Sequence, residues 1–138
     1  MLAEKNLKYI MPVRRNNPAI EYGPIRDGEC KMKNRHFIWR GRVIRYYQYE
    51  VSGHRFITYL DDRLRVEEEQ DYLTRITTHP DGYTEAGYQE RLRRFGTLTL
   101  TYRMSGVKAP DEVYMAYKQR NEIEKNLFFA HPVCKVSG

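Results

Sequence analysis

The chain has 138 residues, a length that fits one small domain with a modest core. Its 24 Lys and Arg residues outnumber its 18 Asp and Glu residues, and the resulting net charge of +6 favours a polyanionic partner. Because no apolar run approaches the roughly 20 residues of a membrane-spanning helix, and because Cys30 and Cys134 show no disulfide or metal-ligand spacing, we expect a cytoplasmic protein without membrane contact.

The first part of the chain combines a short helical stretch with a strand. Residues 1–7 have the apolar spacing of the end of a helix, and Lys8 to Val13 are predicted to form a strand. Arg14 and the polar residues after it close this strand. Residues 17–34 contain two prolines and two glycines and are predicted to be a loop.

The clearest strands follow this loop, and three are predicted: His36–Arg40, Arg42–Val51 and Arg55–Leu60. Gly41 marks a turn or bulge between the first two, and Ser52-Gly53 marks the next turn. Arg and Tyr alternate along these strands, which fits two interpretations. Either they contact the phosphates and bases of DNA, or the strands form a meander whose aromatic rings pack its core and whose arginines are solvated.

A helix is predicted from Arg63 to Thr77, with Leu64, Leu73 and Ile76 as its apolar positions. Asp61, at the junction between strand and helix, is interpreted as the N-cap rather than as a metal ligand. The three glutamates of residues 67–69 are expected to form a solvated face of this helix.

The composition of residues 79–82 predicts a turn, and Thr84 is expected to cap a second short helix that runs to Arg94. Three arginines gather in the last turn of this helix: Arg91, Arg93 and Arg94. Gly96 is expected to end the helix, and Thr97 to Tyr102 alternate as a further strand.

The last helix is predicted to begin at Pro110, because proline and two following acids favour a first helical turn. Helical spacing places Tyr117, Arg120 and Glu124 along one border of an apolar stripe. Geometry alone leaves two interpretations of this border. Glu124 is either a metal ligand oriented by Arg120, or the partner of Arg120 in a surface ion pair between residues i and i+4.

The order Tyr117-x2-Arg120-x3-Glu124 resembles the signature of DDE transposases from prokaryotic insertion sequences. It is most similar to the subgroup whose RNase H-like catalytic domain contains a β-rich insertion. Residues 9–16 are similar to the segment after the second catalytic Asp of these enzymes, and residues 37–61 resemble the insertion. The resemblance covers roughly residues 1 to 125. It departs from the family at Asn121, where a bulky aromatic is usual, and at His131, where the family has Lys.

The resemblance implies an α+β fold, a partial RNase H-like catalytic domain, and metal-dependent DNA strand cleavage and transfer. Glu124 would be the third catalytic acid and a ligand of Mg²⁺ or Mn²⁺. Tyr117, Arg120 and His131 would contact the DNA of the transposon ends, together with the strand arginines Arg40, Arg42 and Arg45. His131 would be a weaker phosphate partner than the family's Lys.

The resemblance also divides the chain into parts. Residues 1–20 would be a remnant of the RNase H-like core, 21–105 the β-rich insertion with its two short helices, 106–131 the signature helix and 132–138 an irregular tail. Both catalytic Asp residues would precede Met1. We therefore expect a nucleoid-associated transposase fragment that does not bind metal stably or cut DNA alone.

An alternative function belongs to a different class of protein. A small basic module of this kind would bind DNA, or join an intact transposase in mixed oligomers, and so interfere with it. A homo-oligomer is also compatible with the sequence.

Overall fold

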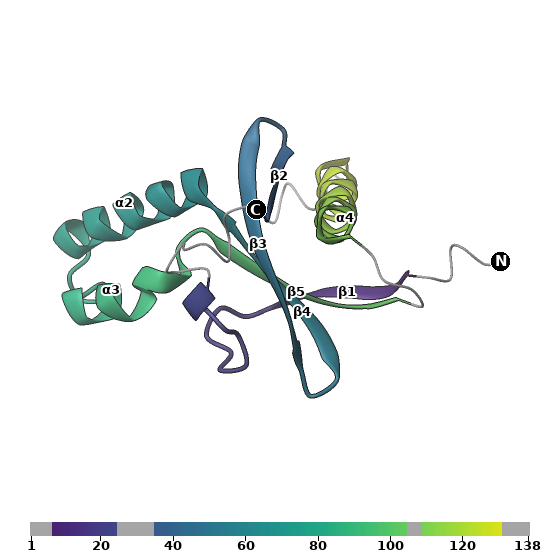
Figure 1. The fold of residues 1–138 in the computed structure, drawn as a ribbon. Coiled ribbons are helices and arrows are strands. Elements are labelled where there is room, and N and C mark those ends of the chain that lie inside the picture. The colour runs from purple at the N-terminus through teal and green to yellow at the C-terminus, as the bar shows by residue number, and fades with distance from the viewer. Residues whose placement is uncertain (1–6, 25–34, 105–108, 131–138) are drawn as a thin grey trace. The chain divides into compact units, whose positions relative to one another are not determined.

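A computed structural model of the chain describes residues 7–24, 35–104 and 109–130. These residues form a mixed α+β fold with a five-stranded antiparallel sheet of order β1-β5-β4-β3-β2 and three α-helices (Figure 1). The chain divides into two compact units, residues 12–101 and residues 1–11 with 102–138. The α+β class predicted from the sequence is confirmed.

The strands are β1 (Leu7–Val13), β2 (His36–Trp39), β3 (Arg42–Val51), β4 (His54–Asp61) and β5 (Thr97–Met104). The helices are α2 (Asp62–Thr78), α3 (Glu85–Arg91) and α4 (Pro110–Ala130), and a 3₁₀ turn, η3, covers Leu92–Arg94. Every strand and helix predicted after residue 7 is therefore confirmed in type and approximate position. The predicted helix end is wrong at Leu7, which begins β1, and the rest of that segment lies outside the described residues.

Strands β2, β3 and β4 form an antiparallel meander joined by two turns of two residues each. Arg40 and Gly41 form the first turn with φ angles of 51° and 78°, and Ser52 and Gly53 form the second with 50° and 82°. Positive φ at both positions is the property of the type I′ turn, whose twist matches that of the flanking strands. The predicted turns at Gly41 and Ser52-Gly53 are thus confirmed.

The core of the 12–101 unit is centred on β4, where five successive residues from Phe56 to Leu60 are buried. Both faces of β4 are therefore covered, as expected for a central strand. One of the five is polar: Thr58, which is fully buried. Its hydroxyl lies 2.7 Å from the Tyr49 hydroxyl and 2.8 Å from the Thr99 hydroxyl, so a chain of hydrogen bonds satisfies these buried groups.

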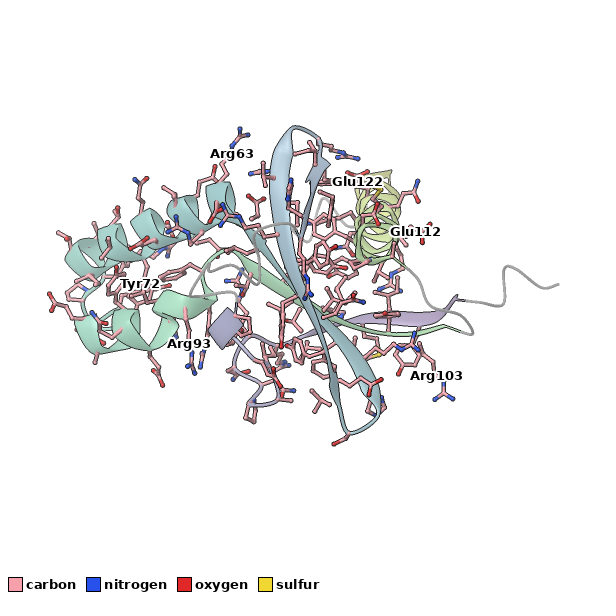
Figure 2. All side chains as sticks on the ribbon, in the orientation of Figure 1. Arg63, Tyr72, Arg93, Arg103, Glu112 and Glu122 are labelled. Atoms are coloured by element: carbon pink, nitrogen blue, oxygen red, sulfur yellow. The ribbon has the colours of Figure 1, made fainter. Side chains whose placement is uncertain are left out.

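Helices α2 and α3 lie side by side and enclose an aromatic cluster (Figure 1). Its centre is Tyr72, which is buried and points from α2 toward α3 (Figure 2). Its ring contacts those of Tyr83, Tyr88 and Phe95 at centroid distances of 5.1 to 6.2 Å. Leu73, predicted as an apolar position of this helix, is 43% exposed. The buried face of α2 is therefore centred one residue earlier than the sequence analysis placed it.

Side-chain caps begin both helices of this pair, as predicted. The Asp61 carboxylate accepts hydrogen bonds from the backbone N–H groups of Arg63 and Leu64 at 3.0 and 3.2 Å. The Thr84 hydroxyl accepts one from the N–H of Gly87 at 3.0 Å. Each cap satisfies backbone donors that have no partner inside the helix.

The prediction that the three glutamates of α2 form a solvated face is wrong for two of them. Glu68 accepts a hydrogen bond from the backbone N–H of Gly96 at 2.8 Å and pairs with the guanidinium of Arg15 at 3.0 and 3.2 Å. Glu69 accepts a hydrogen bond from the Tyr88 hydroxyl at 2.6 Å, and this bond raises the pKa of that phenol. Both carboxylates therefore join α2 to other segments of the same unit.

Candidate nucleic-acid interface

The three signature residues Tyr117, Arg120 and Glu124 all lie in helix α4, which begins at Pro110 as predicted. Val113 and Tyr114 are the buried side chains of the first turns, and Tyr117 follows one turn later, half-buried. The predicted apolar stripe of this helix consists of Ala116, Ile123 and Leu127. Ala116 is half-buried, and the side chains of residues 123 to 130 lie outside the described part of the chain. His131 also lies outside the described residues.

Arg120 has a structural contact that the sequence did not predict. Its Nη2 donates a hydrogen bond of 2.6 Å to the carbonyl oxygen of Ile10, which lies in β1. Its guanidinium carbon also lies 5.6 Å from the centroid of the Tyr117 ring. This hydrogen bond uses one nitrogen of the Arg120 guanidinium, and the other N–H groups of the same guanidinium can donate to a further acceptor. Arg120 therefore attaches α4 to β1 and keeps a capacity for anion binding.

The strand arginines are more occupied than the DNA-contact interpretation assumed. Arg42 Nε lies 3.1 Å from the Asp61 carboxylate, and Arg45 lies 3.5 Å from the Asp62 carboxylate. A guanidinium that faces a carboxylate contributes less positive potential to the surface. Arg40 occupies the first position of the β2–β3 turn, and its guanidinium lies 4.7 Å from the centroid of the Trp39 ring.

A second group of arginines lies at the end of α3 and in η3, and the sequence alone indicates no role for it. The guanidinium carbon of Arg93 lies 5.6 Å from the centroid of the Tyr22 ring. Arg91 lies 5.5 Å from the centroid of the Tyr72 ring. The signal available in the sequence was the dense run of arginines, Arg91, Arg93 and Arg94, just before the glycine at 96. A run of this kind indicates a basic patch only when its partners in the fold are known.

A cavity of about 430 Å³ lies between α2 and α3 in the 12–101 unit. Its lining combines acids, bases and aromatic rings, among them Glu68, Asp71, Tyr72, Tyr83 and Arg91. The charges of opposite sign are largely matched inside this lining, so the cavity favours no single class of charged ligand.

Within residues 7–24, 35–104 and 109–130, no group of three or more His, Cys, Asp or Glu side chains is arranged to hold a metal ion. In the same ranges, no helix has the length and apolar character needed to cross a membrane.

Comparison with known proteins identifies no relative of this chain. No family model matches the sequence, and neither a curated protein nor a solved structure matches it.

Proposed function

We propose that this chain is part of a DDE transposase and supplies the β-rich insertion and the third acid, Glu124, of an RNase H-like catalytic domain. One observation carries most of the proposal. The hydrogen bond from Arg120 to the Ile10 carbonyl joins two of the three segments on which the resemblance rests, the signature helix and the strand of residues 9–16. These segments are 110 residues apart in sequence, and the antiparallel meander lies between them. That order is the one the resemblance implies.

The metal chemistry of the proposed family needs more carboxylates than the described part of this chain brings together. Two metal ions in such enzymes are held by two aspartates and one glutamate, and they stabilise the attacking and leaving oxygens at phosphorus. The described residues contain no group that fits such a site. We therefore assign no metal-dependent step to the described residues, and propose that Glu124 acts beside aspartates from another segment or chain.

A protein of these 138 residues is expected not to nick DNA. Supercoiled plasmid incubated with it and Mg²⁺ or Mn²⁺ should stay as intact as in buffer, because one carboxylate cannot position two metal ions. Gel analysis of the relaxed form measures this. The matched control is Glu124→Gln, which should behave identically. Nicking that requires Glu124 and persists through purification would contradict the proposal.

The same protein is expected to bind short duplex DNA through phosphate contacts. Each phosphate contact contributes about −0.9 to the slope of log K against log salt concentration. Two or more contacts therefore predict a slope of about −2 or steeper. Fluorescence anisotropy of a labelled duplex over a range of chloride concentrations measures this slope. An affinity that stays constant across the range would remove phosphate contact, and with it the DNA-binding part of the proposal.

The second candidate is a small DNA-binding or interaction module that interferes with an intact transposase. The η3 arginines favour it, because no described acid forms an ion pair with Arg93 or Arg94. The genomic DNA on either side of the gene separates the two proposals. Two Asp codons in the family's sequence context ahead of the gene support the transposase part. A separate ribosome-binding site without such codons in any frame supports the module.

A further inference from the structure

Three arginines gather around one buried tyrosine in the 12–101 unit, and we call Arg15, Tyr22, Arg93 and Arg94 the Tyr22 cluster. The Tyr22 hydroxyl donates a hydrogen bond of 2.7 Å to the carbonyl oxygen of Arg15. The guanidinium of Arg93 lies over the Tyr22 ring, 5.6 Å from its centroid. The Thr97 hydroxyl donates a 2.7 Å hydrogen bond to the Arg94 carbonyl oxygen. Segments separated by about seventy residues of sequence therefore meet at one point.

The pKa of the Tyr22 phenol is raised, because burial outweighs the influences that lower it. Those weaker influences include the positive charges of Arg94, Arg15 and Arg93.

The charges of the Tyr22 cluster are only partly balanced. Arg15 forms a two-pronged pair with Glu68, at 3.0 and 3.2 Å, and its charge is neutralised. Neither Arg93 nor Arg94 forms an ion pair with an acid of the described residues. Arg94 Nε is also buried without a hydrogen-bond partner in that part of the chain. Two positive charges on adjacent residues therefore have no acidic partner in the described part of the chain, and an anion would balance them.

The backbone beneath these charges is held in place on both sides. Arg15 Nε donates a hydrogen bond of 3.0 Å to the Thr97 carbonyl oxygen, and Glu68 binds the N–H of Gly96. The segment that carries Arg93 and Arg94 is thereby fixed between α3 and β5. Guanidinium groups on a fixed backbone lose less conformational entropy when they bind an anion than mobile side chains lose.

We propose that the Tyr22 cluster binds the phosphodiester backbone of duplex DNA, with Arg93 and Arg94 as the contacting residues and Arg15 as a positioning residue. This inference rests on the proposed function as a DNA-binding protein and assigns the contact to residues that the sequence analysis left without a role. The planar guanidinium offers two parallel N–H donors, which match two phosphate oxygens. Arg42 and Arg45 face carboxylates and are expected to contribute less.

The test compares two variants, each of which removes two positive charges. Arg93→Gln/Arg94→Gln removes the proposed contacts, whereas Arg63→Gln/Arg103→Gln removes two exposed arginines from elsewhere (Figure 2). Anisotropy of a labelled duplex at several chloride concentrations gives the salt slope for each protein. Loss of a phosphate contact reduces the slope by about one, so the cluster variant is expected to lose about two. The control variant is expected to lose less than one.

A third variant, Arg93→Lys/Arg94→Lys, keeps the charge and separates a lost contact from a lost fold. It is expected to retain the salt slope and to bind more weakly, because lysine cannot form the two-pronged contact. Thermal melts of all variants compare their folding. If the Gln variant melts early, the Lys variant alone decides: unchanged affinity of the Lys variant would then overturn the inference.

The remaining outcomes separate the inference from the function on which it rests. If the unmodified protein shows no salt-dependent binding, the proposed function fails first. If the unmodified protein binds DNA and the salt slopes of the two Gln variants fall by the same amount, the protein binds DNA at a site other than the Tyr22 cluster.

Discussion

Gly96→Ala is expected to lower the free energy of unfolding by about 2–5 kcal/mol, a large effect for a single substitution. Gly96 has a φ angle of +76°, a conformation that costs a residue with a Cβ about 1–2 kcal/mol. A Cβ at this position would lie 2.6 Å from Arg65 Cβ and 2.7 Å from the Arg65 backbone. The chain must move to relieve this clash, and overpacking of this kind costs about 1–3 kcal/mol more.

Gly53→Ala is the matched control for this prediction. Gly53 has a similar φ angle of +82°, but a Cβ there meets no atom within 4 Å. Its substitution is expected to cost only the conformational part, about 1–2 kcal/mol. Urea unfolding followed by circular dichroism measures both variants. Equal losses for the two glycines would contradict the close packing of Gly96 against α2.

Thr58→Val is expected to lower the free energy of unfolding by about 2–4 kcal/mol. The substitution keeps the shape of the side chain and removes the hydroxyl that links Tyr49 to Thr99. The Thr99 hydroxyl then loses its buried hydrogen bond, at a cost of about 1–3 kcal/mol. The Tyr49 hydroxyl keeps the hydrogen bond from the N–H of Glu21 and loses the one to Thr58, at a cost of about 1 kcal/mol more. Adding Thr99→Val is expected to cost less than the sum of the two single losses, because the second change removes a group that is already unsatisfied.

Thr101→Val makes the same chemical change at a position with the opposite expectation. The Thr101 hydroxyl is buried without a hydrogen-bond partner among the described residues. Replacing it by a methyl group is expected to leave the stability unchanged or to raise it by up to about 1 kcal/mol. Chemical unfolding of Thr58→Val and Thr101→Val under the same conditions gives the comparison. A larger loss at Thr101 than at Thr58 would refute the role of the hydroxyl chain.

The local parts of this fold were predictable because their causes are local. Alternation of side chains predicted β3, and the glycines that follow Arg40 and Ser52 predicted a turn or bulge and a turn, which the structure shows to be type I′ turns. Asp61 and Thr84 were recognised as caps because the side-chain oxygen of an N-cap reaches N–H groups two or three residues later. Each of these predictions needed only neighbours within a few positions.

The face of α2 could not be assigned so easily, because apolar character is an incomplete guide to burial. The buried and half-buried residues of this helix are Asp62, Leu64, Arg65, Glu68, Glu69, Tyr72 and Ile76. At 100° per residue they span one strip centred on Tyr72, and two glutamates belong to it. The glutamates are there because distant partners, Gly96, Arg15 and Tyr88, bind them. No local pattern reveals partners of that kind.

Only part of the candidate site was predictable from the sequence, because some of its residues have partners that are distant in the chain. Helical spacing placed Tyr117, Arg120 and Glu124 in one helix, and the structure has them in α4. The strand arginines were proposed as DNA contacts because the sequence shows their charge and not the carboxylates of Asp61 and Asp62 beside them. The proposed contacts of these residues with DNA, and of Glu124 with a metal ion, stay predictions.

The hydrogen bonds of Arg15 have a consequence for how the chain reaches its native state. Arg15 contacts Glu68 and Thr97, 53 and 82 positions further along the chain. Closing loops of this length has a large entropic cost early in folding, and proteins rich in such contacts fold slowly. During synthesis, the hydrogen bond from Arg15 to Thr97 cannot form until the ribosome has released Thr97. We therefore expect nascent chains stalled before that residue to be cut by protease near Arg15, and completed chains to resist.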